Sequence, residues 1–574
     1  MSRNLKPVAV TAALLFAAAA FSASLGHGAP ATAQPATTTA DDACAKLAGL
    51  KLDQVVIDSA RTQPAKAPVE GARLTDMAGT PGAGPPVAGL PAFCRVVGHI
   101  HPEPGSDIRF EVWMPSEGWD GRFNGGNNGG FAGSIDYIGL SMAVKAGQAT
   151  ASTDTGHAGT GTQSAWAKGH PERVRDYGWR GVHLTTVAGK RLVASYYGRG
   201  PDHAYFIGCS NGGRQALMEA SRFPDDYDGI VAGAPAAMFT DLIMSLSNTI
   251  QAQLPPGAAL RPEQAHLLQS EVVKQCDPID GQVDGLIDDP RQCRFDASKL
   301  ACGTNSSPQC FTKPQLEALK RIQAGPHDSS GRRVAWGYPP SGAEAGDPAP
   351  GLGWEGWIMQ GQKTPPMHSD FSTGVLTNLV AKPFATPQSV DFDKDPARLK
   401  AALGADLDAM PNMSRFFARG GKLIVWHGWA DAAIPPQATL AFRDRILSRS
   451  GPKAKTQMRL FLVPGVQHCA GGTGADVIGQ IGAPQPGDTP DRSVGAAVQA
   501  WVETGRAPEA LVGRRGFGGL MGTPESKPEK QRLICAYPAK AVLKPDADPD
   551  KASSYSCHMA SAAQSGKRAG KRAG

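Results

Sequence analysis

One five-residue segment constrains the fold of this chain more than any other. Residues 208–212 read Gly-Cys-Ser-Asn-Gly, and they follow a buried-strand pattern at 203–207 and precede a helical stretch at 213–223. A serine between glycines on a sharp strand-to-helix turn is held above the end of a parallel sheet, with the helix N-terminus beneath it. The segment therefore predicts an α/β fold and makes Ser210 a candidate nucleophile.

Strands and helices alternate through much of the chain. Apolar or β-branched runs predict further strands at 94–100, 108–114, 147–153, 229–232, 422–426 and 458–463, and apolar spacing predicts a helix at 182–197. This alternation is typical of a mostly parallel, doubly wound sheet. Residues 34–90 are rich in Pro, Ala and Gly, and we expect a leader followed by an irregular approach to the first strands.

A chain of 574 residues exceeds what one hydrophobic core usually organises. From about 236 to 410 the pattern changes to Pro- and Gly-rich segments with four cysteines and scattered tryptophans. We interpret this stretch as a lid domain inserted between two core parts, 34–235 and 411–562. A poorly ordered linker is the alternative, disfavoured because cysteines and tryptophans belong to packed structure.

The N-terminus predicts export. Arg3 and Lys6 precede an apolar run at 8–21 and then small residues, which is typical of a signal peptide, here residues 1–33. The run is shorter than the roughly 20 residues that span a bilayer, which disfavours a membrane anchor. No other segment is long enough to span, so we expect no membrane insertion of the mature chain and a secreted or periplasmic location.

The net charge of +6 does not point to an anionic partner. Two charges lie in the signal segment and four in the tail, residues 563–574, which we expect to be disordered. The remaining body is nearly neutral, which argues against binding nucleic acid or an anionic membrane surface. The oligomeric state stays open.

Serine needs a base, and a carboxylate must fix the tautomer of that base. His468 and Asp431 follow the predicted strands 458–463 and 422–426 and have the order along the chain that this fold uses. His427 is the nearest rival base, but it precedes the acid and adjoins a strand, so a structural or pocket role fits it better. His157 and His183 precede the nucleophile and fit worse. Together with the fold class, these residues predict an α/β-hydrolase fold with a Ser210, His468 and Asp431 triad.

Two cysteines adjoin the proposed triad, because Cys209 precedes Ser210 and Cys469 follows His468. A disulfide between them would bring nucleophile and base together, since bridged Cα atoms lie roughly 4.4 to 6.8 Å apart. Two unrelated buried thiols are the alternative. The ten cysteines suggest five disulfides in an oxidising compartment.

A glycine-rich loop, residues 125–130, follows the strand pattern that ends at Phe123. It is flexible enough to place a backbone N–H near an oxyanion, so Gly129 or Gly130 is the candidate second donor beside the N–H of Asn211. A glycine-rich loop without a catalytic role is the alternative.

Within the insertion, residues 276–286 place three carboxylates on one turn. Calcium takes six to eight oxygens, and Asp277, Asp280 and Asp284 with the carbonyls of Gln282 and Leu286 would supply most of them. The spacing does not match an EF-hand. A solvated acidic turn closed by Cys276 and Cys293 is the alternative.

These features resemble the tannase and feruloyl esterase family, which also includes the hydrolase of mono(2-hydroxyethyl) terephthalate. The resemblance rests on the Cys-Ser pair in 208–212, the Asp431 segment, the His468-Cys469 pair and the acidic loop. It implies a calcium-stabilised lid over an α/β-hydrolase core. It also implies four further disulfides: Cys44–Cys94, Cys276–Cys293, Cys302–Cys310 and Cys535–Cys557. The residue after the nucleophile varies in the family, so only the backbone N–H of Asn211 is carried over.

We therefore expect hydrolysis of esters of aromatic carboxylic acids, of the feruloyl or galloyl kind, through an acyl-enzyme on Ser210. His468 would act as base and then as acid, and the substrate would be a small aromatic ester. A lipase or peptidase on the same fold is one alternative. A non-catalytic exported binding protein is another, disfavoured by the complete triad.

Overall fold

The computed structural model describes residues 39–74, 83–303, 309–347, 350–360, 364–516 and 530–559. The chain divides into two units, residues 1–39 and 40–574, and the fold below is that of the second. The predicted signal peptide and the predicted tail, 563–574, lie outside the described residues.

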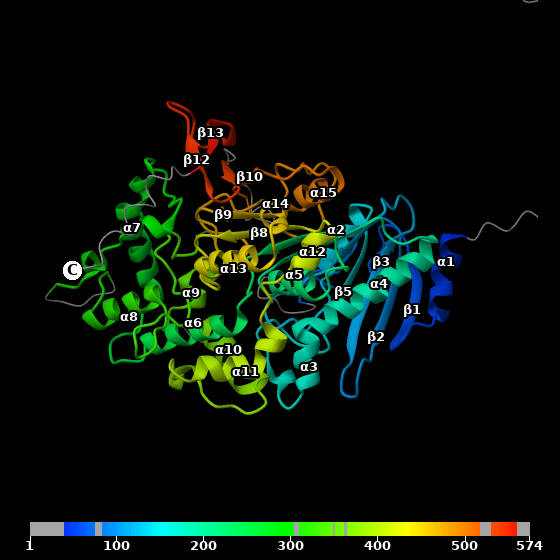
Figure 1. Cartoon of the computed structure of the whole chain (residues 1–574), viewed down its shortest axis with the longest axis horizontal. Helices are drawn as coiled ribbons and strands as arrows, with labels where there is room; N and C mark the ends of the chain where they lie inside the picture. The colour runs from blue at the N-terminus through cyan, green and yellow to red at the C-terminus, as the bar shows by residue number, and fades with distance from the viewer. Residues whose placement is uncertain are drawn as a thin grey trace, which may run out of the picture. The chain divides into compact units, whose positions relative to one another are not determined.

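A nine-stranded sheet organises this unit (Figure 1). The strands lie in the order β1-β2-β3-β5-β4-β6-β7-β8-β9; the β1–β2, β2–β3 and β3–β5 pairs are antiparallel and all later pairs are parallel. The bounds are β1 Val55–Gln63, β2 Phe93–Ile100, β3 Ile108–Pro115, β4 Arg122–Gly125, β5 Ala149–Thr153, β6 His203–Cys209, β7 Gly229–Gly233, β8 Lys422–Gly428 and β9 Met458–Val463. The predicted α/β-hydrolase class, with a mostly parallel sheet, is confirmed.

Both faces of the parallel part of the sheet are buried, as the doubly wound prediction requires. Consecutive residues of β6 enter different cores: Phe206 packs with α4 and α5 on one face, and Ile207 packs with α15 on the other. The helices outside the insertion are α1 Ala40–Lys46, α2 Tyr137–Lys145, α3 Pro171–Arg175, α4 Gly181–Tyr197, α5 Asn211–Arg222, α13 Pro436–Arg449, α14 Lys453–Gln457 and α15 Val494–Thr504.

The expectation of an irregular segment at 34–90 is wrong in part. Helix α1 and the nine-residue strand β1 lie within it, and β1 forms the edge of the sheet beside β2. The burial of β1 does not alternate cleanly, because an edge strand with one bulge presents partly exposed residues on both sides. Its sequence therefore lacks the period-two pattern that identified the other strands.

Between β7 and β8 the chain forms a helical insertion, and its buried residues, which include Ile243, Leu268, Trp354 and Trp357, form one core cluster with residues such as Phe131 and Tyr177 from before the insertion. Its packed helices argue against the linker alternative, while the predicted domain boundaries stay a prediction. The helices are α6 Phe239–Ala252, α7 Ala265–Cys276, α8 Lys313–Ala324, α9 Trp354–Trp357, α10 Met367–Gly374, α11 Asp395–Leu407 and, directly before β8, α12 Ser414–Ala418.

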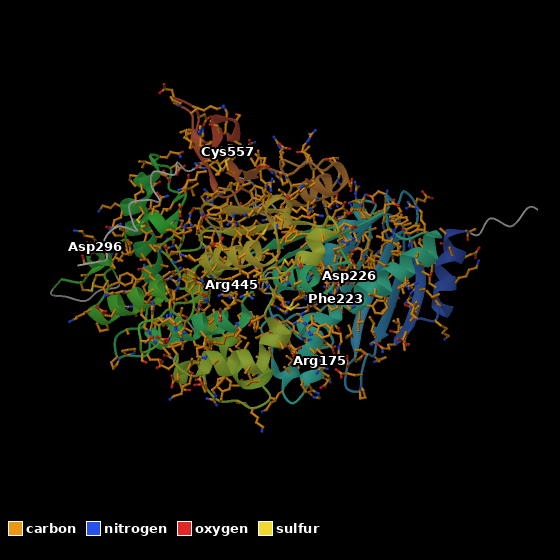
Figure 2. All side chains as sticks on the ribbon, viewed as in Figure 1. Arg175, Phe223, Asp226, Asp296, Arg445 and Cys557 are labelled. Carbon is orange, nitrogen blue, oxygen red and sulfur yellow. A yellow bond between two sulfur atoms is a disulfide. The ribbon has the colours of Figure 1, made fainter. Side chains whose placement is uncertain are left out.

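After α15 the chain adds two small antiparallel sheets that sequence patterns did not predict. They pair β10 Ala510–Arg514 with β11 Gln531–Cys535, and β12 Ala539–Leu543 with β13 Tyr555–Met559. Cys557 of β13, labelled in Figure 2, is bonded to Cys535 of β11.

All five expected disulfides are present. Besides Cys535–Cys557 they are Cys44–Cys94, Cys209–Cys469, Cys276–Cys293 and Cys302–Cys310. None of the helices in the described part of the chain combines the length and apolar character that crossing a bilayer requires.

Candidate active site

Ser210 occupies the turn between β6 and α5. Its backbone has φ 63° and ψ −123°, a conformation that few non-glycine residues adopt, and its N–H donates to Gly233 O at 3.0 Å. A Cβ on Gly208 would lie 2.5 Å from Gly212 O, and one on Gly212 would lie 2.5 Å from Asn127 Oδ1. Glycine is therefore required at both flanking positions, as the motif predicts.

The structure brings the three predicted triad residues into one hydrogen-bonded chain. His468 Nε2 lies 2.8 Å from Ser210 Oγ, and His468 Nδ1 lies 2.8 Å from Asp431 Oδ2. The loops that carry acid and base are bonded to each other, because Ala430 N donates to Val466 O at 2.9 Å. This geometry allows proton transfer from serine to histidine; the catalytic roles stay a prediction.

Asp431 is fully buried and accepts several hydrogen bonds. Ala433 N and Ile434 N each donate to its Oδ1 at 2.8 Å, and His427 Nε2 lies 3.0 Å from its Oδ2. Burial alone would raise the pKa of Asp431, but His468 and His427 together hold it below its ordinary value. Asp431 is therefore ionised at neutral pH and stabilises positive charge on His468.

His427, the rival base, contacts the same carboxylate as His468, because both histidines face Asp431 Oδ2. Its Nε2 faces Asp431 Oδ2 and the Ile434 carbonyl, at 3.1 Å, while its Nδ1 lies 2.8 Å from Thr439 Oγ1. Because both neighbours of Nε2 are acceptors, that nitrogen carries the proton. His427 thus helps to orient Asp431.

The other two rival histidines have partners of their own. His157 stacks on Trp166 with ring centroids 3.7 Å apart, and its Nε2 lies 2.8 Å from Phe131 O. Burial lowers the pKa of His157 to about 4. His183 Nδ1 lies 2.6 Å from Asp226 Oδ2. Each histidine has a structural role outside the triad.

The Cys209–Cys469 disulfide joins the neighbours of nucleophile and base. Its Cα atoms lie 5.9 Å apart, within the expected range, and the bond connects positions separated by 260 residues. Cys469 also has a positive φ of 63°. The bond therefore links the turn after β6 directly to the loop after β9.

The glycine-rich loop that follows β4 is tied to the first turns of α5. Asn128 N donates to Gln215 Oε1 at 3.2 Å, and Asn211 Nδ2 donates to Asn128 O at 3.3 Å. At Gly130, φ is 52° and a Cβ would lie 2.2 Å from Gly161 O, whereas Gly129 is exposed. The loop thus lies beside Asn211 and the nucleophile turn, and the assignment of Gly129 or Gly130 as second donor stays a prediction. Sequence reasoning missed the Asn128–Gln215 clamp, which has no local signal.

Aromatic side chains from the insertion adjoin the base. Trp357 contacts His468 edge to face, with ring centroids 5.3 Å apart, and stacks on Phe371 at 6.0 Å. Phe371 lies 5.1 Å from Phe131, which follows the glycine loop. The triad is thus bordered by aromatic surface. The sequence identified Trp357 only as packed structure, since its distance from His468 depends on tertiary folding.

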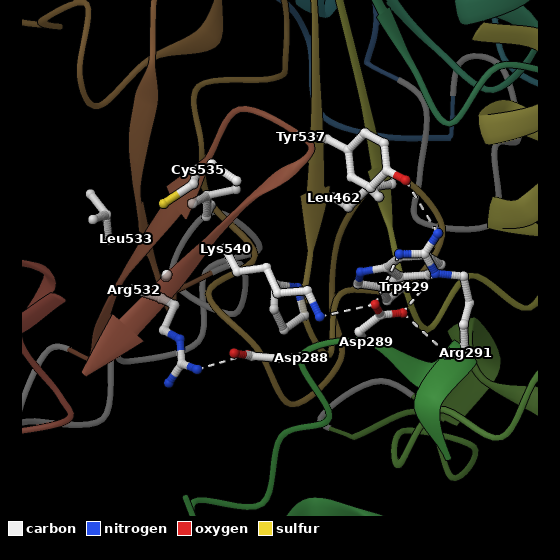
Figure 3. Close-up of a pocket in the computed structure, with 14 residues that line it drawn as sticks. Asp288, Asp289, Arg291, Trp429, Leu462, Arg532, Leu533, Cys535, Tyr537 and Lys540 are labelled. Carbon is white, nitrogen blue, oxygen red and sulfur yellow. Dashed lines mark hydrogen bonds and ion pairs between the residues drawn. The ribbon is translucent and has the colours of Figure 1, made fainter. Parts of the chain in front are cut away.

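The acidic loop brings carboxylates together beside a basic residue. Asp277 is buried and accepts from Asp284 N and Gly285 N, while Asp284 Oδ2 lies 2.7 Å from Arg532 Nη1. Burial, with the charges of Asp288 and Asp284, raises the pKa of Asp280 to about 6. In Figure 3, Arg532 also pairs with Asp288 at the edge of the adjoining pocket. Arg532 thus balances only part of the negative charge of this loop.

The donor set of the loop fits a hard divalent cation, which prefers carboxylate and carbonyl oxygens. Asp277, Asp280 and Asp284 with the carbonyls of Gln282 and Leu286 would hold calcium. The carboxyls of Asp277 and Asp280 already accept backbone N–H groups of the turn, at 3.0 to 3.4 Å. Calcium binding stays a prediction.

A parallel sheet, a serine on the strand-to-helix turn and a Ser–His–Asp hydrogen-bonded chain on the loops after later strands define the class of α/β-hydrolases. Residues 94–558 match the family model described as tannase and feruloyl esterase. The chain belongs to this family, and it is a carboxylic ester hydrolase.

Individual relatives agree with this assignment. An uncharacterized esterase of Xanthomonas campestris pv. campestris is 35% identical over 90% of this chain and 92% of its own length. The mono(2-hydroxyethyl) terephthalate hydrolase of Piscinibacter sakaiensis is 31% identical over 82% of this chain and 85% of its own. The crystal structure of feruloyl esterase B from Aspergillus oryzae is similar with a TM-score of 0.78 and 25% identity, covering 91% of this chain and all of that one.

Proposed function

We propose that this protein is an exported serine esterase that hydrolyses esters of aromatic carboxylic acids through an acyl-enzyme on Ser210. The observation that carries the proposal is the pair of 2.8 Å contacts, from Ser210 Oγ to His468 Nε2 and from His468 Nδ1 to Asp431 Oδ2. A serine hydroxyl needs such a base to attack an ester at neutral pH.

In the first half-reaction, Ser210 Oγ attacks the ester carbonyl carbon while its proton passes to His468 Nε2. Asp431 stabilises the imidazolium that results. The tetrahedral intermediate then breaks its bond to the alcohol oxygen, which takes the proton from His468. The products are the free alcohol and an ester between the acid and Ser210.

In the second half-reaction, His468 removes a proton from water, and the hydroxide attacks the acyl carbon. Collapse of the intermediate breaks the bond to Ser210 Oγ, which recovers its proton from His468. The N–H of Asn211 and one N–H of the glycine loop stabilise the oxyanion in both steps. One such donor contributes roughly 3 to 4 kcal/mol in other acyl-transfer enzymes.

The aromatic acyl group is supported by the surroundings of His468. Trp357, Phe371 and Phe131 offer flat apolar surface that an aromatic ring can contact by stacking or edge-to-face packing. Relatives at about the same identity are named as feruloyl esterases and as a hydrolase of mono(2-hydroxyethyl) terephthalate. Both names describe esters of aromatic acids.

We further propose that calcium binds the loop of Asp277, Asp280 and Asp284, with the carbonyls of Gln282 and Leu286. When bound, the ion supplies positive charge that cancels carboxylate repulsion and fixes the turn. The acidic loop lies within the segment of the insertion that the Cys276–Cys293 disulfide closes, and its residues fix the course of that segment. Export to an oxidising compartment is supported by the five disulfides and by the predicted signal peptide, residues 1–33.

A substrate panel with purified protein tests the function. Methyl ferulate, methyl gallate and mono(2-hydroxyethyl) terephthalate should be hydrolysed with higher kcat/KM than a short aliphatic ester or a peptide amide. Ser210→Ala should lower kcat by about 10⁴-fold or more at unchanged folding. Ser221→Ala, on the same helix, should keep full activity. Residual turnover of Ser210→Ala within tenfold of the native protein would exclude the serine mechanism, and preference for aliphatic esters would exclude the aromatic substrate class.

A further inference from the structure

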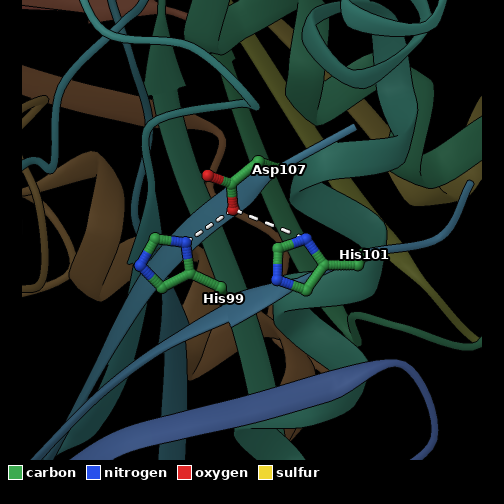
Figure 4. Close-up of side chains that lie close together, drawn as sticks. All are labelled: His99, His101 and Asp107. Atoms are coloured by element: carbon green, nitrogen blue, oxygen red, sulfur yellow. Dashed lines mark hydrogen bonds and ion pairs between the residues drawn. The ribbon is translucent and has the colours of Figure 1, made fainter. Parts of the chain in front are cut away.

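A cluster of metal-ligating side chains lies on the antiparallel part of the sheet and takes no part in the proposed catalysis. His99 belongs to β2, and His101 follows its last residue, so the two alternate positions put both rings on one side of the strand. The rings lie nearly parallel, 6.0 Å apart. Figure 4 shows the Asp107 carboxylate between them, with Oδ1 at 2.5 Å from His99 Nδ1 and 3.7 Å from His101 Nδ1.

A bulge in β1 brings a second carboxylate to the far side of His99. Ile57 pairs with Gly98 and Ser59 with Val97, which leaves Asp58 as the extra residue of the bulge. Bulges redirect a side chain that a regular strand would place elsewhere. Asp58 Oδ2 lies 3.2 Å from His99 Nε2, so β1, β2 and the turn before β3 all contribute to one cluster.

The contact between Asp58 and His99 Nε2 has the form found at histidine metal ligands. A ligating imidazole usually donates its other N–H to a carboxylate, which fixes the tautomer and leaves the ligating nitrogen unprotonated. Asp58 has this place at Nε2. Without a metal, His99 Nδ1 faces the Asp107 carboxylate; with the metal bound, the ring proton stays on Nε2 beside Asp58, and Nδ1 is the ligating nitrogen. Two neutral imidazoles with two carboxylates carry a charge of about −2, which balances a divalent cation.

We propose that His99, His101 and Asp107 bind a zinc ion on the outer edge of the sheet, with Asp58 as the residue that orients His99. Imidazole and carboxylate suit Zn²⁺, whereas Ca²⁺ and Mg²⁺ prefer sites made of oxygen alone. A water molecule completes four-coordination. This site is independent of the proposed esterase function.

The two distances from Asp107 Oδ1 to the histidine nitrogens need only a small adjustment. Tetrahedral Zn²⁺ with bonds of about 2.0 to 2.2 Å holds its ligand atoms about 3.3 Å apart. Asp107 Oδ1 therefore moves by less than about 1 Å away from His99 and toward His101. The side chains of Asp107 and His101 are 57% and 48% exposed and can make this movement. The metal–nitrogen bond replaces a long contact from His101 Nδ1 to Ser106 O, at 3.3 Å.

One other cluster in the described part of the chain offers the same kinds of ligand: His183, Glu219 and Asp226. It lies between α4 and α5, where Lys190 already donates to the Asp226 carbonyl and supplies positive charge. Because the ammonium group of Lys190 already supplies positive charge there, we expect no metal binding at this second cluster, and it serves as a matched control for the first.

Isothermal titration of untagged, EDTA-treated and calcium-saturated protein with ZnCl₂ tests the site. We expect one equivalent of tight binding and a higher Tm with zinc. His101→Gln should lower the affinity at least tenfold, and Asp58→Asn should lower it between about tenfold and a hundredfold, the range for residues that orient a metal ligand. His183→Gln should leave affinity and stoichiometry unchanged.

Three results would overturn the proposal. The first is a native protein that neither takes up zinc nor changes its Tm; the cluster would then be an ion pair of His99 with two aspartates. The second is binding that His183→Gln abolishes and His101→Gln preserves. The third is an Asp58→Asn variant with native affinity, which would exclude the orienting role. Esterase activity equal to that of the native protein verifies the fold of each variant.

Discussion

His157 shows how a residue near the active site can set the acid stability of the protein. It is buried and stacked on Trp166, with its Nε2 facing the carbonyl of Phe131, the residue that follows the glycine loop. Burial lowers its pKa to about 4, so the native state excludes a proton that the unfolded chain binds at about pH 6.5.

The lowered pKa of His157 determines the direction in which stability changes with pH. As pH falls from about 6.5 to about 4, the unfolded state gains a proton first, so His157 lowers the free energy of unfolding by up to about 3 kcal/mol. His157→Gln lacks this contribution. The stability difference between native protein and variant, measured by urea unfolding at about pH 7.5 and about pH 4, should shrink by up to that amount. His558→Gln, an exposed position, should show no such change; a pH-independent difference for His157→Gln would contradict the prediction.

At the residue scale, local motifs placed the three predicted triad residues at the ends of strands that the structure contains, while their catalytic roles stay a prediction. Ser210, Asp431 and His468 follow β6, β8 and β9, and parallel strands end at the same edge of a sheet. The contacts of His427, Trp357 and Gln215 could not be predicted in this way. Their partners are distant in the sequence, so only the tertiary packing brings them to the site.

At the scale of elements, the Cys209–Cys469 bond joins the two turns that carry the proposed nucleophile and base. Changing both cysteines to Ala should lower kcat by about a hundredfold, because a misplacement of about 1 Å between nucleophile and base has that cost. The measurement is kcat on one aromatic ester, well below the Tm of each variant. The Cys302, Cys310 double variant is the control and should keep kcat within about twofold, since neither of its cysteines adjoins a triad residue in the sequence.

The free energy of unfolding of both double variants is measured together with kcat. The 260-residue separation predicts a loss of roughly 5 to 6 kcal/mol for the first variant in the chain-entropy model, against roughly 2 to 3 kcal/mol for the control with a separation of 8. Full kcat in the folded Cys209, Cys469 variant would make the bond an ordinary cross-link.

The acidic loop is a second element with a testable dependence. Removal of calcium should leave Asp277, Asp280 and Asp284 repelling one another, so EDTA should lower the Tm and Ca²⁺ should restore it. At a ligand concentration of a hundred times Kd the expected stabilisation is about 2.7 kcal/mol. Asp280→Asn should weaken the response, whereas Asp296→Asn, an exposed position in the same insertion, should keep it. An unchanged Tm after EDTA, with no calcium by elemental analysis, would leave the turn as merely solvated.

At the scale of the whole molecule, three of the five disulfides join separate elements: α1 to β2, the turn after β6 to the loop after β9, and one small sheet to the other. The other two each close one segment within the insertion. Each such bond typically contributes about 2 to 4 kcal/mol. Full reduction of the mature chain should therefore lower its urea midpoint more than loss of any single bond. Urea unfolding with and without dithiothreitol, with a thiol count, measures this. Ten free thiols at an unchanged midpoint would contradict it.

The predictable part of the whole fold is the central sheet. Its parallel strands β6, β7 and β8 carry mostly apolar runs, since parallel strands are buried on both faces. Strand β1 and the small sheets β10 to β13 are partly exposed and antiparallel, so their sequences lack such runs. Their formation depends on the surfaces they pack against.

The position of the helical insertion has a consequence for how such a chain can diversify. Its two ends leave β7 and enter β8, which are paired neighbours in the sheet, and a disulfide outside it joins the turns that carry the proposed nucleophile and base. Lengthening, shortening or replacing the helices between those ends leaves the register of the sheet and the spacing of serine and histidine in place. Two of the three aromatic residues proposed to contact the acyl group, Trp357 and Phe371, thereby lie in a stretch of polypeptide that carries no residue of the proposed triad.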